Sequence, residues 1–420
     1  MKIKIKRINI LISLVVFSTL VPFINIFPSF SIQAVCMLGA AFYIALPAVR
    51  HTSVSRSTFF LLLFFLGWLM FSLSGFTESR VSIYVPLSSF MLLAIGASRI
   101  RNSEKFPEYM IKITGIVSAF FTIFYSYNKT AYANYARSTY PEDAAMLILD
   151  NLNGNIAGLY NHYSKNGMVL AMATGILFVS FLYANNSRWK KINFLLLLTC
   201  AIALLFSGKR GPIIFTVLSA GICYVLSMGK KISLKKILKI ILLAIIVILS
   251  FIVLSNFIPQ LARFIQRFEE AEEAGSITMG RDAYYAYAIS MFLSSPLLGH
   301  GWFSFVSVIG QNVHNIYLQL LAETGILGFL FFVCGFLYIL WTAVSEYRKS
   351  QISGDRFGMC QLLKAVFIIV FFLLYGFTGN PLYDALMFCP FFIAIGIMRF
   401  YHENRGKQDR NFYGRKEIVR

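Results

Sequence analysis

Long apolar runs separated by short polar loops dominate this chain. An apolar run of about 20 residues is long enough to cross the ~30 Å hydrocarbon core of a membrane as a helix. The hydropathy pattern predicts twelve such spans, at residues 8–27, 31–49, 58–76, 81–98, 113–127, 166–184, 192–206, 211–228, 238–258, 315–342, 362–378 and 383–399. The pattern therefore predicts an all-α integral membrane protein with a large extracytoplasmic helical loop between its ninth and tenth spans.

These spans divide the chain into four parts. The first nine spans occupy residues 1–258, the loop with short amphipathic helices occupies 259–314, the last three spans occupy 315–400, and a basic tail occupies 401–420. The run at 8–27 follows a basic start but has no small-x-small cleavage site. It is therefore interpreted as a retained first helix rather than a secretory signal.

Composition and charge support this class. The chain is 58% hydrophobic and 13% charged, which excludes an ordinary soluble domain. Its net charge of +20 is typical of nucleic-acid binding proteins, but basic residues of membrane proteins also gather in cytoplasmic loops. With the N-terminus inside, 29 of the 38 Lys and Arg residues fall on the inner side. We therefore predict that both termini are cytoplasmic, and that the basic tail contacts lipid phosphates rather than nucleic acid.

The cysteine pattern gives no sign of a disulfide framework or a zinc site. None of the six cysteines forms a CxxC pair, and most lie inside apolar segments: Cys36, Cys200, Cys223, Cys334, Cys360 and Cys389. The outer side also has no acidic metal-binding cluster such as DxD. The sequence predicts no metal and no cofactor.

One turn predicted on the outer side carries two positive charges, although basic residues of membrane proteins usually lie on the inner side. Residues 207–212 read Ser-Gly-Lys-Arg-Gly-Pro between two spans. Gly208 and Gly211 permit a sharp reversal, and Pro212 suits the first turn of the next helix, whose free amides attract anions. Lys209 and Arg210 would add two cations to such a site. The pattern fits an anion site and a simple turn equally well.

A second group of polar residues lies where the large loop returns to the membrane. His314 opens the tenth span, and Glu323 lies nine residues further, about 13 Å along a helix. A histidine at this boundary is either an interfacial hydrogen-bonding residue or a base. A carboxylate inside a span needs a partner, often a cation or a tyrosine from another helix.

The loop before His314 is predicted to contain a helix that begins near residues 278–280 and ends at Ser295 and Pro296. It carries Arg281 and Tyr284. Aromatic residues at a membrane surface usually form an interfacial belt, but they also suit contacts with sugar rings. Both interpretations stay open.

These motifs together resemble the O-antigen ligase and O-antigen polymerase superfamily. The resemblance rests on the Ser-Gly-Lys-Arg-Gly turn, on Gly-His-Gly-x-x-x-Phe at 299–305, and on His-Asn-x-Tyr-Leu with Glu-x-Gly-x-x-Gly at 314–328. It implies metal-independent, inverting transfer of an undecaprenyl-diphosphate-linked glycan to an acceptor hydroxyl. It also implies that the active site lies on the outer face of the bacterial inner membrane.

The resemblance assigns roles to individual residues. Arg210 and Arg281 correspond to the arginines that face the donor diphosphate, with Lys209 as an added cation. His314 corresponds to the histidine that orients or deprotonates the acceptor hydroxyl, and Glu323 stands at an acidic position that is either structural or catalytic. The candidate catalytic residues are thus His314, Arg210, Arg281 and Glu323, and the candidate glycan contacts are Tyr284, Trp302 and Tyr317.

The sequence leaves the acceptor open. A polymerase joins repeat units of an O-antigen or capsule, whereas a ligase attaches the finished glycan to lipid A-core or to a protein; polymerase is slightly preferred. A flippase for lipid-linked sugars is the alternative from another class, and it predicts ionisable residues at mid-membrane depth and matching halves. Expected partners are the lipid-linked donor, a glycan or lipid A-core acceptor, membrane lipid and other polysaccharide-assembly proteins.

Overall fold

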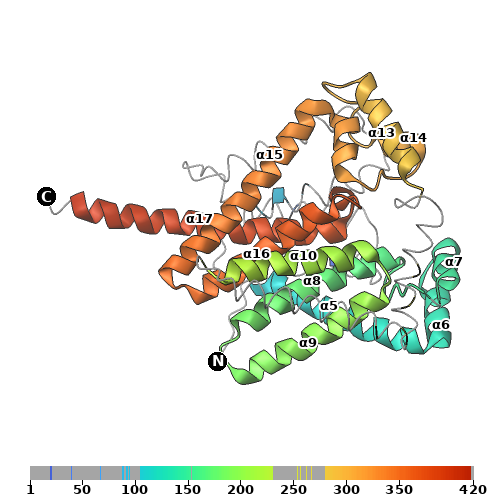
Figure 1. Ribbon diagram of the computed structural model, residues 1–420, viewed down its shortest axis with the longest axis horizontal. Helices are drawn as coiled ribbons and strands as arrows, with labels where there is room; N and C mark the ends of the chain where they lie inside the picture. Colours follow the sequence, from blue (N-terminus) through green and yellow to red (C-terminus); the bar gives the residue numbers. More distant parts are fainter. Residues whose placement is uncertain are drawn as a thin grey trace. The chain divides into compact units, whose positions relative to one another are not determined.

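The computed structural model describes residues 105–229 and 280–417, except position 153, and a few isolated residues elsewhere. Every regular element in these ranges is a helix, which agrees with the predicted all-α class (Figure 1). The elements are α5 (Lys105–Tyr127), α6 (Lys129–Thr139), α7 (Glu142–Asp150), α8 (Tyr163–Tyr183), α9 (Ser187–Phe206), α10 (Arg210–Ser227), α13 (Asp282–Ser294), α14 (Ser304–Ile309), α15 (Ile316–Ser353), α16 (Arg356–Tyr375), η2 (Pro381–Tyr383) and α17 (Ala385–Glu417).

Seven of these helices are long and apolar enough to cross a membrane: α5, α8, α9, α10, α15, α16 and the part of α17 up to Glu403. They confirm the seven spans predicted within the described ranges. The spans predicted at 8–27, 31–49, 58–76, 81–98 and 238–258 lie outside the described residues. The total of twelve, and the division of the chain at 258, 314 and 400, therefore stay predictions.

Two helix ends differ from the predicted spans. Helix α15 does not stop at residue 342 but continues to Ser353, where Gly354 ends it in the left-handed conformation (φ 69°). Helix α17 likewise continues past residue 399 into the basic tail, as far as Glu417. The apolar pattern predicts only the part of a helix that suits the membrane. It therefore did not predict the polar extensions of these two helices.

The described residues belong to two compact units. One holds the residues up to Met110 and from Ala283 onward, and the other holds 111–282. We call them unit 1 and unit 2. Each contains a buried hydrophobic cluster of its own.

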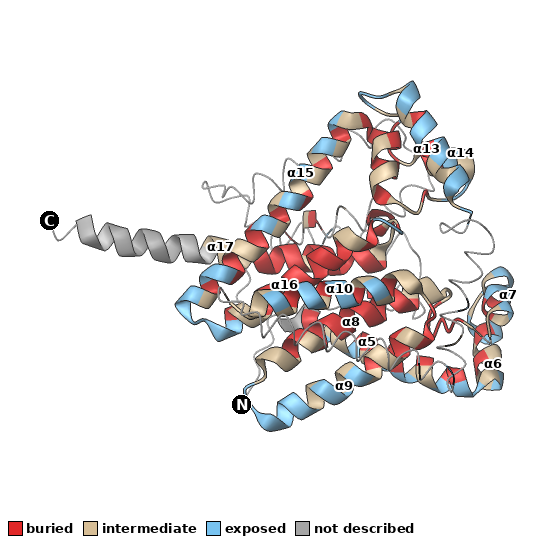
Figure 2. Ribbon diagram, in the orientation of Figure 1, coloured by how far each residue is buried: buried red, intermediate tan, exposed pale blue. Residues whose placement is uncertain are grey.

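In unit 2, α8 is the central helix. It packs against both α9 and α10, and most of its side chains are buried (Figure 2). Gly115 of α5 lies directly against Ala173 of α8, the close approach that small residues allow between membrane helices. The outer helices α9 and α10 leave apolar side chains such as Leu195 and Val217 exposed, which suits contact with lipid.

The short helices α6 and α7 hold the segment that leads into α8. Tyr132 Oη accepts a hydrogen bond from Ala157 N at 2.7 Å, and burial raises the pKa of Tyr132 well above its ordinary value. Tyr135 Oη donates to Leu159 O at 3.1 Å, and Tyr140 Oη donates to the same carbonyl. Side chains of α6 and the residue after it therefore supply partners for backbone groups that belong to no helix.

In unit 1, α16 packs between α15 and α17. Its Lys364 forms a buried ion pair with Glu108, with Lys364 Nζ 2.8 Å from Glu108 Oε1. Gln361 Nε2 donates to the other oxygen of Glu108 at 3.1 Å. Pairing of this kind is what allows charged groups to lie inside an apolar bundle.

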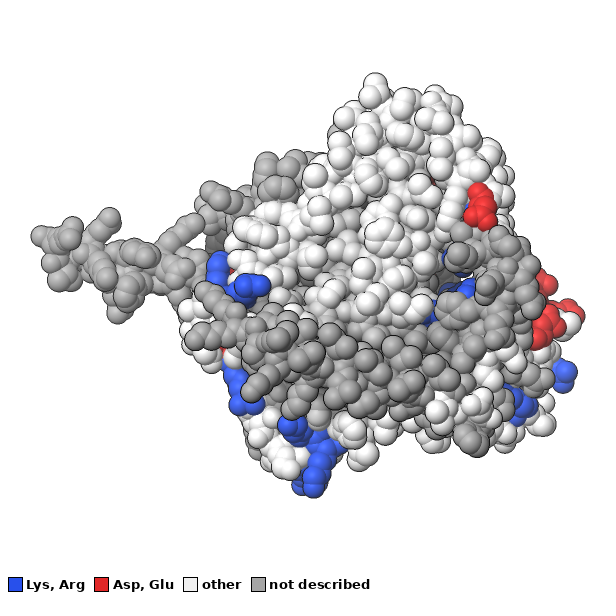
Figure 3. Space-filling model, in the orientation of Figure 1, with Lys and Arg blue, Asp and Glu red and all other residues white. Residues whose placement is uncertain are grey.

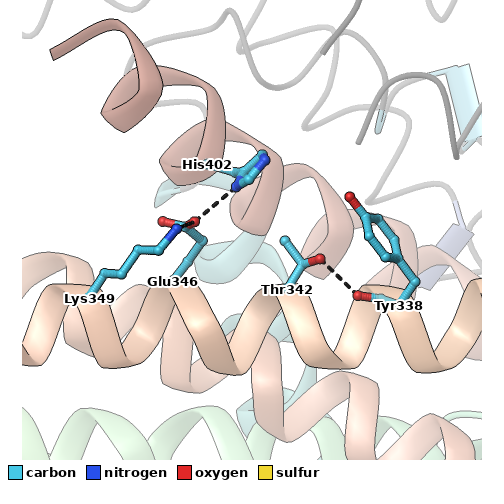
Figure 4. A network of polar contacts seen from close by, with 5 residues as sticks. All are labelled: Tyr338, Thr342, Glu346, Lys349 and His402. Atoms are coloured by element: carbon cyan, nitrogen blue, oxygen red, sulfur yellow. Dashed lines mark hydrogen bonds and ion pairs between the residues drawn. The ribbon is translucent and has the colours of Figure 1, made fainter. Parts of the chain in front are cut away.

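A polar network joins the polar end of α15 to α17 (Figure 4). Lys349 Nζ and His402 Nδ1 lie 2.7 and 2.8 Å from Glu346 Oε1. These contacts give the polar end of α15 partners of its own, and they explain why the helix continues beyond residue 342.

Candidate active site

The turn between α9 and α10 in unit 2 carries both cations of the predicted anion site. Gly208 adopts a left-handed φ of 66°, and a Cβ at this position would overlap Asn155 Oδ1. Only glycine satisfies both the conformation and the available space. Lys209 is the N-cap residue of α10, and Arg210 is its first residue. The predicted helix start at this turn is confirmed.

Asn155 and Ile156, which no sequence pattern singled out, lie against this turn. Ile156 N donates to Phe206 O at 3.3 Å, at the end of α9. Asn166 is fully buried; it accepts from Ser118 Oγ at 2.6 Å and donates to Ile156 O at 2.9 Å. The available signal was the density of Asn and Gly in this stretch, which is also typical of ordinary loops.

The N-terminal ends of α8 and α10 lie close together at this turn. Gly167, in the first turns of α8, faces the side chains of Lys209 and Pro212. Lys209 Nζ lies 4.9 Å from the ring centre of Tyr163, the first residue of α8, in a cation–π contact. Two helix N-termini thus add their partial positive charge to that of Lys209 and Arg210. Such a grouping of positive charge at helix N-termini is typical of anion sites, and an anion site here stays a prediction.

Unit 1 builds a second site around Glu323, which is fully buried in α15. Its carboxylate accepts four hydrogen bonds, from Phe303 N (2.7 Å), Phe305 N (3.3 Å), Gln319 Nε2 (3.0 Å) and Tyr383 Oη. The sequence predicted that Glu323 needs a cation or a tyrosine from another element, and Tyr383 of η2 is that partner. The carboxylate therefore joins the loop before α14, helix α15 and the turn before α17.

Helix α15 has a break at Gly325, and the loop before α14 packs against this break. Gly325 has φ 62° and ψ −171°, so the helix is interrupted there. Ile326 N donates to Pro296 O at 2.8 Å across the break. A Cβ on Gly325, or on Gly299 of the facing segment, would collide with backbone atoms of the other segment. Both glycines are needed for the two chain segments to approach this closely.

His314 is held in an uncommon backbone conformation immediately before α15. Its φ is 61°, in the left-handed region that non-glycine residues rarely adopt. Gln319 Oε1 accepts from Val313 N at 3.3 Å. Asn315 Oδ1 caps α15 by accepting from the backbone amides two and three residues further on, at 3.0 and 3.2 Å. Conformations enforced from both sides in this way gather at functional sites.

The three candidate glycan contacts lie in different surroundings. Trp302 is fully buried and stacks on Tyr383 with ring centres 5.0 Å apart. Tyr317 is partly buried and donates its hydroxyl to a backbone carbonyl of α16 at 2.7 Å. Tyr284 is partly exposed, and its hydroxyl donates to Gln311 Oε1 at 3.3 Å. Of the three, Tyr284 and Tyr317 keep exposed surface.

The predicted site residues therefore fall into two groups. Unit 1 brings Trp302 and Glu323 together and links them, through Gln319, to the turn that holds His314. Lys209 and Arg210 belong to unit 2, which ends with Arg281 and Asp282 at the start of α13. Joint action of the two groups stays a prediction. Among the described residues, no three or more His, Cys, Asp or Glu side chains gather into a potential metal site.

Comparison with known families adds an independent observation. A family model described as O-antigen ligase matches residues 194–333, about a third of the chain. The resemblance to the O-antigen ligase and polymerase superfamily is confirmed. The matched stretch contains the cationic turn, Arg281, His314 and Glu323. This match, together with seven candidate membrane spans in the described residues, indicates a bacterial membrane protein of the glycan-transferring type. No curated protein matches the chain.

Proposed function

We propose that the protein transfers a glycan from a lipid diphosphate to an acceptor hydroxyl at the outer face of the bacterial inner membrane. The observation that carries this proposal is that one family match contains both a cationic turn and a conformationally fixed histidine. The first suits a phosphate leaving group, and the second suits an acceptor hydroxyl. The donor we infer from the superfamily is an undecaprenyl-diphosphate-linked glycan.

The donor end of the reaction is assigned to Lys209, Arg210 and Arg281. As the bond between the sugar and the diphosphate oxygen breaks, negative charge develops on the departing diphosphate. Fixed cations and helix N-termini stabilise this charge more in the transition state than in the bound donor. Such stabilisation does the work that a divalent metal does in other transferases, so we expect transfer to be metal-independent.

The acceptor end is assigned to His314. A neutral imidazole accepts the proton of the acceptor hydroxyl while that oxygen attacks the sugar from the face opposite the diphosphate, which inverts the configuration. The capped and hydrogen-bonded turn fixes the backbone from which the His314 side chain extends. Glu323 is assigned a positioning role, because four donors already surround its carboxylate.

Polymerase is our slightly preferred form of this activity, with a second glycan repeat unit as acceptor. Ligation of the finished glycan to lipid A-core or to a protein uses the same chemistry. A flippase, the alternative from another class, gains no specific support from the described residues. In the described part of the chain Glu108, Lys364, Glu346 and Arg399 are buried, and each has an ion-pair partner within unit 1.

Two experiments test this proposal. Deletion of the gene should leave single repeat units in place of long chains if the protein is a polymerase, and full-length chains on the carrier lipid if it is a ligase; units trapped on the cytoplasmic face would indicate a flippase. In a reconstituted transfer assay, Arg210→Ala should lose roughly 10²–10³-fold in rate, as expected for a group that stabilises transition-state charge. Arg137→Ala, at an exposed arginine of α6, is the matched control. Equal rates in both variants would contradict the assigned role.

A further inference from the structure

A hollow of about 460 Å³ lies between α13 and α14 in unit 1, apart from the residues assigned to the reaction. This volume is in the range of small-molecule binding sites, about 300–1,000 Å³. One wall is a single face of α13 with spacing i, i+3, i+4 and i+7; the other wall comes from α14, and one histidine closes an end. The lining residues are Tyr287, Ser290, Met291 and Ser294, then Ser304 and Val308, and His300.

The hollow rests on a fixed base. Met291 on its floor belongs to a buried cluster with Phe305 of α14 and Ala322 of α15. The start of α14 is held by the bonds from Phe303 N and Phe305 N to Glu323. The α14 wall is therefore positioned by the same carboxylate that organises the candidate site of unit 1, and the α13 wall packs on α14 through the buried cluster.

The lining offers hydrogen bonds without charge. His300 Nε2 lies 2.8 Å from Met291 O and 2.8 Å from Ser294 Oγ. Because a carbonyl only accepts, Nε2 of His300 carries a hydrogen and donates it. Ser304 Oγ is buried and has no hydrogen-bond partner among the described residues. On the face shown in Figure 3, the described surface over α13 and α14 is almost entirely uncharged. This chemistry suits a neutral, hydroxyl-rich ligand.

The turn after α13 and the neighbouring part of α15 expose a group of leucines. Leu293, Leu297 and Leu298 are 69%, 63% and 61% exposed, and Leu327 of α15 is 53% exposed. Leu327 N donates to Leu297 O at 3.3 Å, so these leucines stand beside the break in a candidate membrane span. Exposed leucines at this level suit immersion in the lipid interface. A sugar carried on a membrane lipid would emerge at this height.

We propose that the hollow between α13 and α14 is a subsite for an uncharged sugar unit of the glycan, a proposal that rests on the function proposed above. Tyr287, 37% exposed and packed edge-on against Phe305, offers an aromatic surface for a sugar ring. The polar side chains of Ser290, Ser294 and His300 line the hollow and offer hydrogen bonds to sugar hydroxyls. Binding energy from a sugar unit remote from the reacting bond selects which glycan is transferred.

The test fills the hollow and measures sugar binding directly. Ser290→Trp places an indole inside it, whereas Ile289→Trp, the next position on α13 and 46% exposed, adds the same side chain outside the lining. The probe is the oligosaccharide repeat released by mild acid from the surface glycan of the same cells. Binding is measured on purified protein in nanodiscs of phosphatidylethanolamine and phosphatidylglycerol. We expect the Kd to weaken at least tenfold in Ser290→Trp and to stay unchanged in Ile289→Trp.

The outcomes separate this proposal from the proposed function. Equal binding of the oligosaccharide by the wild type and Ser290→Trp, or displacement of lipid rather than sugar from the hollow, would overturn the subsite. Free oligosaccharide binding requires no transfer. A wild-type protein that binds the sugar through the hollow but transfers nothing would therefore keep the subsite and reject the transfer reaction. Normal transfer without sugar binding at the hollow would do the reverse.

Discussion

Replacement of Glu323 by alanine is the sharpest test of how unit 1 is held together. The change removes the acceptor of two backbone amides, those of Phe303 and Phe305, and of two side-chain donors. A buried donor left without a partner costs about 1–3 kcal/mol. Counting only the two backbone amides, because the side chains can turn to other partners, the loop should lose about 2–6 kcal/mol of local stability.

Hydrogen exchange measures this loss where it occurs. Since about 1.4 kcal/mol corresponds to a factor of ten, the amides of residues 303 and 305 should exchange roughly 30-fold to 10⁴-fold faster in Glu323→Ala than in the wild type. Glu323→Gln keeps one carbonyl oxygen and the shape of the side chain, so it should fall between the two. Because the carboxylate is assigned a positioning role, Glu323→Gln should also keep measurable transfer activity.

Thr342→Val is the matched control for this experiment. It also changes a buried polar residue of α15, but it removes only the bond from Thr342 Oγ1 to Tyr338 O within the helix. Exchange at residues 303 and 305 should not respond to it. If Glu323→Ala left these two amides as protected as they are in the wild type, the carboxylate would not hold the loop. If Glu323→Gln abolished transfer while protection stayed intact, the residue would be catalytic.

Other expectations follow from the same contacts. Gly208→Ala should destabilise unit 2, because the new Cβ meets Asn155 in a left-handed turn; thermal unfolding should show a lower Tm than for Gly221→Ala, where the space is open. His314→Ala should lower kcat more than it changes the Kd for the donor, and equal losses would indicate a structural role. Transfer should continue in EDTA, since the donor charge is assigned to Arg210 and its neighbours; a strict need for a divalent metal, seen on titrating one back, would contradict this. Tyr383→Phe removes one of the four bonds to Glu323 and should raise amide exchange at residue 303 less than Glu323→Ala does.

The membrane spans could be predicted because each crossing requires a run of about 20 apolar residues. The seven apolar helices of the described part were all visible in hydropathy. The extension of α15 to Ser353 was not, because the segment beyond 342 is rich in polar residues; among them, Glu346 contacts Lys349 and His402. Hydropathy indicates which residues suit a lipid environment. The end of this helix is instead marked by Gly354, which has a left-handed backbone conformation.

The candidate site could be predicted only where its signal is local. The glycine and proline spacing at 207–212 indicated a tight turn before a helix, and the helix begins there. Gly299 packs against the break at Gly325, and Gly208 packs against Asn155. Both contacts join segments that are far apart in the sequence. Such contacts cannot be predicted from one segment alone. The sequence therefore indicated the glycines but not the residues that they pack against.

Three of the cations that the sequence predicts on the outer side illustrate why an unusual location is not by itself a sign of function. Lys129 is used within the fold, since its Nζ donates to Leu152 O just after α7, and burial lowers its pKa. Lys209 and Arg210 differ, because they stand at the N-terminus of α10 and close to that of α8. A cation there opposes the helix dipole and is disfavoured by about 0.3–1 kcal/mol, where an anion would be favoured by as much. In the function proposed above, a bound diphosphate would turn the repulsion among these positive charges into attraction.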